Sequence, residues 1–104
     1  MALQAAFIFL AGGADAARHR ATIETPQVSL TVVGVADYAA AEAAARELIA
    51  QGVVAIELCG GFGHAGTARI AAAAGTKAVV GAVRFDGHPG LGGKSGDSVF
   101  ASAG

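Results

Sequence analysis

Two glycine-rich stretches of this chain contain most of the side chains that could do chemistry. The first runs from Glu57 to His64 (ELCGGFGH), and the second runs from Arg84 to Asp97 (RFDGHPGLGGKSGD). Together they hold the single cysteine and two of the three histidines. Histidine, cysteine and carboxylate groups are the usual acids, bases, nucleophiles and metal ligands of enzymes, and backbone amides in glycine-rich loops bind anions. The two stretches therefore predict a functional site.

The candidate residues fall into two groups by the chemistry of their side chains. We expect acid–base or nucleophilic roles for His64, His88, Glu57 and Cys59. We expect binding of an anion or cofactor by Gly60, Gly61, Gly63, Gly66, Arg84, Asp86, Lys94 and Ser95. Each catalytic candidate also has a structural interpretation. A lone cysteine at a strand end is often ordinary packing, a histidine at the rim often bonds a backbone carbonyl, and Glu57 would pair with Arg84.

Two patterns in the sequence resemble nucleotide-binding motifs, one complete and one that misses a required glycine. Residues 61–66 match G-x-G-x-x-G, and Asp86 lies twenty residues further on, as in a dinucleotide-binding fingerprint. The chain is short for a complete doubly wound domain, however, and Phe62 and His64 are bulky for that turn. Gly93-Lys94-Ser95 resembles the end of a P-loop, but the required first glycine falls on His88. Generic anion binding at a helix N-terminus, or by Lys94, is the interpretation that we retain, beside a simple tight turn.

A metal ion is a further alternative. The candidate ligands are His64, His88, Cys59 and Asp86, which offer nitrogen, sulfur and oxygen donors. The chain has neither a C-x-x-C pair nor an H-E-x-x-H pattern. The spacing of these residues therefore does not identify a metal or a cofactor.

The elements that position these residues follow from hydrophobic runs and helix signals. Apolar runs predict strands over residues 5–11, 28–35, 53–58 and 78–85, and residues 21–25 could pair with the second of these across a hairpin. Helices are predicted over residues 38–51, between an Asp37 cap and a Gly52 stop, and over residues 67–74. We expect one small α/β domain over residues 1–104, with about four mostly parallel strands and helices packed on the sheet. Residues 87–104 are predicted to form a glycine-rich C-terminal loop and tail.

This strand order predicts where the candidate residues meet. In parallel α/β sheets, ligands bind beyond the carboxyl ends of the strands. Both glycine-rich stretches follow a predicted strand directly. We therefore expect them to lie together at one rim of the sheet.

Composition restricts the partners. The chain is 54% hydrophobic and 14% charged, against about 25% charged in typical domains. So few charges predict that some apolar surface meets another subunit, in a homo-oligomer. A net charge of −1 without a basic cluster argues against nucleic acid, and the apolar run at residues 1–11 is shorter than the roughly 20 residues needed to span a membrane. One cysteine and no basic start before that run favour the cytoplasm.

Four segments carry a resemblance to a known family. They are residues 5–9 (AAFIF), 30–35 (LTVVGV), 55–64 (AIELCGGFGH) and 83–97 (VRFDGHPGLGGKSGD). The chain resembles DUF6506, a family of short microbial proteins of unknown function, from Ala5 to about Phe100. The resemblance implies a small α/β domain that begins at its first strand, and it assigns no activity or catalytic residue.

The leading hypothesis is thus a pocket for an anionic or small-molecule ligand at the carboxyl ends of the strands, with or without catalysis. The alternatives are a non-catalytic binding or assembly module and a metal-dependent enzyme. The residues alone do not decide whether the protein is an enzyme.

Overall fold

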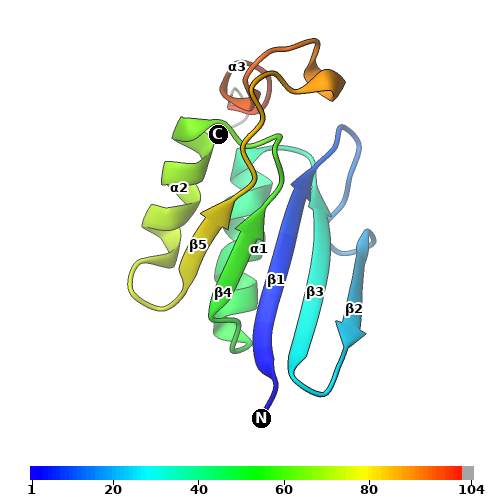
Figure 1. Ribbon diagram of the computed structural model, residues 1–104, viewed down its shortest axis with the longest axis vertical. Helices are drawn as coiled ribbons and strands as arrows, with labels where there is room; N and C mark the ends of the chain where they lie inside the picture. The colour runs from blue at the N-terminus through cyan, green and yellow to red at the C-terminus, as the bar shows by residue number, and fades with distance from the viewer. Residues whose placement is uncertain (102–104) are drawn as a thin grey trace.

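A five-stranded sheet and two long helices form the body of the protein. The computed structural model describes residues 1–101. The elements follow the order β1 (Leu3–Leu10), β2 (Arg20–Glu24), β3 (Val28–Val35), α1 (Tyr38–Ala50), β4 (Ala55–Leu58), α2 (His64–Ala74), β5 (Val79–Ala82), the 3-10 turn η1 (Pro89–Leu91) and α3 (Gly96–Phe100). Figure 1 shows the sheet in front of α1, with α2 beside β5. The predicted small α/β fold is confirmed.

The sheet is mixed but mostly parallel. Its strand order is β2-β3-β1-β4-β5, in which β1 pairs in parallel with β3 and β4, and β4 pairs in parallel with β5. The fifth strand, β2, is antiparallel to β3 and lies at the edge. It is the weakly alternating segment next to Pro26, and an edge position suits it because proline cannot donate to a central ladder.

Helix α1 forms where its capping signals predict it. The Asp37 carboxylate accepts a hydrogen bond from the Ala40 amide at 2.8 Å, and Gly52 follows the helix with a φ of 105°. Small residues dominate its buried face, which consists of Tyr38, Ala41, Ala44, Ala45 and Leu48. These short side chains let the helix lie close to the sheet.

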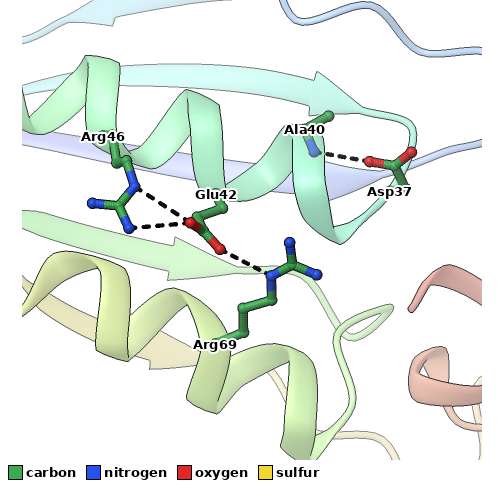
Figure 2. A network of polar contacts seen from close by, with 5 residues as sticks. All are labelled: Asp37, Ala40, Glu42, Arg46 and Arg69. Carbon is green, nitrogen blue, oxygen red and sulfur yellow. Dashed lines mark hydrogen bonds and ion pairs between the residues drawn. The ribbon is translucent and has the colours of Figure 1, made fainter. Parts of the chain in front are cut away.

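Helix α2 is tied to α1 by one carboxylate (Figure 2). Glu42 on α1 accepts a hydrogen bond from Nε of Arg69 on α2 at 2.9 Å, and it also pairs with Arg46 one turn along α1 at 3.1 Å. The Arg69 guanidinium, followed by that of Arg46, lowers the pKa of the Glu42 carboxyl. Helix α2 begins at His64 and not at Thr67 as predicted, so its first turn includes residues of the glycine-rich loop.

Both helices cover the same face of the sheet. The chain passes from β3 through α1 to β4, and from β4 through α2 to β5, moving across the sheet in one direction each time. Two right-handed crossovers in the same direction place their helices on the same side. The residues beneath them are fully buried and form the core, including Ala6 and Ile8 of β1, Val33 of β3, and Ile56 and Leu58 of β4.

The C-terminal segment crosses the carboxyl ends of the strands. Strand β5 ends at Ala82, three residues earlier than predicted, and the following chain carries η1 and α3 above the sheet (Figure 1). The predicted loop over residues 87–104 therefore contains two short helical turns, and its last three residues lie outside the described part. Within residues 1–101, no helix combines the length and the apolar character needed to cross a membrane.

Candidate functional site

A cavity of about 610 Å³ opens at the carboxyl ends of β4 and β5. The N-terminus of α2 forms one wall, and residues 82–87 and 93–96 form the other walls. We call it the rim cavity. Its polar lining consists of His64, Thr67, Arg84, Asp86, Lys94 and Ser95. The two glycine-rich stretches are thus brought together at one rim of the sheet.

The structure gathers only part of the predicted site around this cavity. Seven of the candidate residues line it, namely Gly60, Gly63, His64, Arg84, Asp86, Lys94 and Ser95. The others are absent from its lining: Glu57, Cys59, Gly61, Gly66 and His88. Three of the four residues that we considered for catalysis therefore lie outside the cavity.

Glu57 lies on the opposite face of the sheet from the helices. Its neighbours in the strand register are Phe7 of β1 and Gly81 of β5, and its side chain is exposed. The cation considered as its partner, Arg84, instead pairs with Asp86 at 2.9 Å. Both side chains of that pair are largely in solvent.

His88 and Cys59 have structural partners. Nδ1 of His88 accepts a hydrogen bond from the Gly90 amide at 3.0 Å, and its ring centroid lies 4.8 Å from that of Phe85. The Cys59 sulfur accepts hydrogen bonds from two amides, those of Leu10 and Gly61, each at 3.3 Å. His88 therefore caps the turn η1, and Cys59 joins the ends of β1 and β4.

The amides of the first glycine-rich loop are mostly bound by groups of the chain itself. The Asp97 carboxylate accepts hydrogen bonds from the Ala65 and Gly66 amides, both at 3.0 Å, at the N-terminus of α2. The Gly63 amide donates to the Tyr38 hydroxyl at 3.0 Å. The place where a helix terminus would bind an external anion thus holds a carboxylate from α3.

Tyr38 and Asp97 form the most tightly connected polar pair near the cavity. The Tyr38 hydroxyl donates to Asp97 at 2.7 Å. Burial raises the pKa of Tyr38 to about 12, so its hydroxyl remains a proton donor at neutral pH. Burial alone would raise the pKa of Asp97, but the hydrogen bonds from Tyr38, Ala65 and Gly66 outweigh it and hold that pKa below its usual range.

This pair explains the glycine spacing that resembled a nucleotide fingerprint. A side chain at Gly63 would collide with Asp97 and Ser95, and one at Gly66 would collide with the Tyr38 ring. Close packing against Tyr38 and Asp97 therefore requires these two glycines without any pyrophosphate. Our sequence reasoning missed both partners: Tyr38 was only the first residue of a predicted helix, and Asp97 only the last residue of the second stretch.

The metal alternative gains no support from the geometry. Within the described residues, no three histidine, cysteine, aspartate or glutamate side chains lie close enough together to hold a metal ion. The four candidate ligands are distributed between the cavity, the turn η1 and the end of β4.

Comparison with known protein families places this chain in a family. The model of a family of unknown function, DUF6506, matches residues 3–98, which is nearly the whole chain. The chain belongs to the DUF6506 family. The resemblance seen in the four sequence segments is thereby confirmed. No curated protein and no solved structure matches the chain significantly.

Proposed function

We propose that this DUF6506 protein binds a small anionic molecule in the rim cavity. The observation that carries the proposal is the charge of the lining. Arg84, Lys94 and the ionisable His64 come from three different segments, and Asp86 is the one carboxylate among the lining residues. The volume of about 610 Å³ lies within the range of roughly 300–1,000 Å³ that is usual for small-molecule sites.

The proposed contacts to the ligand are made by side chains. Asp97 already accepts hydrogen bonds from the amides of Ala65 and Gly66, so the N-terminus of α2 has few amides left to bind an anion. Arg84 can leave Asp86 to bind a ligand, because the pair is exposed and exposed ion pairs contribute little free energy. Its planar guanidinium suits bidentate binding of a phosphate or carboxylate, and Lys94 adds a point charge.

Any catalysis in this cavity would depend on His64. It is the one histidine in the lining, a residue type that often acts as a general acid or base, and it is exposed at the first position of α2. Glu57, Cys59 and His88 lie outside the cavity. A non-catalytic binding protein would need only the two cations, Arg84 and Lys94. The variant His64→Ala therefore distinguishes the two possibilities: turnover would be abolished in an enzyme, whereas ligand affinity would fall only slightly in a binding protein.

The binding proposal is tested by titrating the protein with inorganic phosphate and with citrate while recording amide chemical shifts. We expect shifts for residues of the loops that line the cavity. The double variant R84A/K94A should bind about a hundredfold more weakly, since each of the two charge-assisted contacts contributes about 1.5 kcal/mol. Lys77→Ala is the matched control, because Lys77 is the other lysine of the chain, is exposed, and lies outside the cavity.

Two results would contradict the proposal. One is the absence of any shift around the cavity with both anions. The other is an equal loss of binding in Lys77→Ala, which would mean that only the net charge matters.

We extend the proposal to a cytoplasmic location, since Cys59 is a free thiol and reducing compartments keep thiols in that form.

A further inference from the structure

The face of the sheet opposite the helices is apolar. Residues paired across the ladders share one face, because side chains alternate between the two faces along each strand. One row across all five strands contains Ile23, Leu30, Ala5, Ala55 and Val79. The next row contains Ala21, Val32, Phe7, Glu57 and Gly81. Leu3, Val28, Phe9 and Gly34 complete this surface, which we call the open face. Glu57 is its single charged residue.

We propose that the open face binds a second copy of this chain, so that two sheets pack face to face in a symmetric dimer. Mostly parallel sheets normally have both faces covered, because their strands are apolar on both sides. Here α1 and α2 cover one face only, and large side chains on the other face remain in solvent. Leu3 is 46% exposed, Ile23 is 56% exposed and Val79 is 72% exposed. Covering them removes apolar surface from water, which favours association.

The open face is also shaped for a flat contact. A side chain at Gly34 would meet the ring of Phe9, so this ring lies across the neighbouring strand and fills the space above the glycine. The apolar surface is therefore continuous between β1 and β3, the two longest strands. Packed sheets lie about 10 Å apart with interdigitating side chains, and such a surface suits that geometry.

The size of the open face is close to what a dimer needs. The strands contain 29 residues. With a spacing of about 4.8 Å between strands and a rise of about 3.3 Å per residue, they project an area of about 460 Å². Two copies would cover roughly 900 Å², and the corrugation of the side chains brings the buried accessible area near the lower limit of about 1,000 Å² for a specific interface.

The chemistry of the open face selects a second copy over other partners. A nearly uncharged aliphatic and aromatic surface is complementary to itself, as a two-fold symmetric interface requires. It presents no lysine or arginine for nucleic acid or for an anionic lipid surface. Glu57 is the exception: it lies on β4, between Phe7 of the central strand β1 and Gly81 of the edge strand β5, and its exposed carboxylate has to stay in contact with water at the interface.

The dimer is independent of the rim cavity. That cavity is lined by α2 residues such as Thr67 and Ala68 and lies on the helix side of the strand ends. Association through the open face leaves it accessible. Failure of the dimer would therefore leave the proposed anion binding unaffected, and the reverse also holds.

Sedimentation velocity over about a hundredfold range of protein concentration tests the proposal, because a dimer dissociates on dilution by mass action. We expect the wild-type protein to sediment at twice its chain mass of 10.1 kDa at the upper concentrations. Val32→Glu places a charge at the centre of the open face and should shift the protein to monomer. Val54→Glu is the matched control: Val54 is 46% exposed but lies before β4 on the alternate register, and this variant should remain dimeric.

The fold of each variant is checked by circular dichroism. If Val32→Glu does not fold, Leu3→Glu replaces it, because Leu3 lies on the central strand β1 and is 46% exposed, the same fraction as Val54 in the control. A wild-type protein that is monomeric at every concentration would overturn the proposal and indicate a different occupant of the open face. Dimers that survive Val32→Glu and Leu3→Glu, or that are lost equally in Val54→Glu, would overturn it too.

Discussion

Replacing Asp97 by alanine should destabilise this protein more than any other single carboxylate substitution at its surface. The Asp97 carboxylate accepts three hydrogen bonds, from the Tyr38 hydroxyl at 2.7 Å and from the Ala65 and Gly66 amides at 3.0 Å. Loss of a cap at a helix N-terminus costs about 1 kcal/mol. The buried Tyr38 hydroxyl would also lose its acceptor, which costs about 1–2 kcal/mol more. We therefore expect a loss of about 2–3 kcal/mol in the free energy of unfolding.

Urea denaturation followed by circular dichroism measures this loss. Asp37→Ala is the matched control, because Asp37 caps α1 through a single amide and has no tyrosine partner. It should cost about 1 kcal/mol. In a chain of this length, the expected difference in Tm from the wild type is roughly 10–20 °C for Asp97→Ala. If Asp97→Ala is no more destabilising than Asp37→Ala, the Tyr38 contact contributes nothing and the reasoning is wrong.

The same carboxylate predicts a dependence of stability on pH. The folded state lowers the pKa of Asp97 below its ordinary 3.8. Its contribution is therefore fully present above pH 3.8, and it is lost as the pH falls below that value through the folded pKa. Asp97→Asn should remove this part of the acid sensitivity. An unchanged fall in stability between pH 5 and acid pH in Asp97→Asn would contradict the assignment.

Three further predictions concern the neighbouring contacts. Gly66→Ala should cost about 2–3 kcal/mol in urea denaturation, because the new methyl group meets the Tyr38 ring, whereas Gly12→Ala, which meets no atom, should be neutral. Tyr38 is the only tyrosine, so an ultraviolet titration of the folded protein should show a pKa near 12. The free energy of unfolding should therefore fall as the pH rises from about 10 through 12. A titration near 10 in the folded state would contradict the burial of Tyr38. Glu42→Gln should weaken the contact with Arg69 and lower the free energy of unfolding at neutral pH, and the stability of the variant should depend less on acid pH. An unchanged dependence of stability on pH between pH 7 and pH 3 would show that the pair contributes nothing.

Local signals in the sequence predicted the secondary structure well. The strand over residues 28–35 and the helix after Asp37 are found within a residue of their predicted bounds. Capping carboxylates, stop glycines and apolar runs act over a few residues, so they can be recognised without the fold. The short α3 was missed, because a five-residue helix in a glycine-rich segment has no hydrophobic periodicity.

The composition of the candidate site could be predicted only in part. Both glycine-rich stretches follow parallel strands, and this topology requires them to meet at one rim. Which side chains face the cavity depends on register and on loop conformation. Glu57 points to the open face because of its position in β4, and His88 bonds Gly90 within its own turn. No spacing rule distinguishes such side chains from those that line the cavity, such as His64 and Lys94.

The sequence by itself determined the class of fold, the elements and the rim at which the glycine-rich stretches meet, because these depend on short-range propensities and on the handedness of crossovers. Only the tertiary structure decided the rest. Asp97 lies 31 residues from Gly66 along the chain, yet it accepts the hydrogen bonds of the amides at the start of α2 that the glycine motif would offer to a nucleotide. The direction of two crossovers places both helices on one side and leaves the open face bare. Contacts between distant segments carry no local signal, so the packing of this chain, and not its motifs, determines which groups remain available for a ligand or for a second copy.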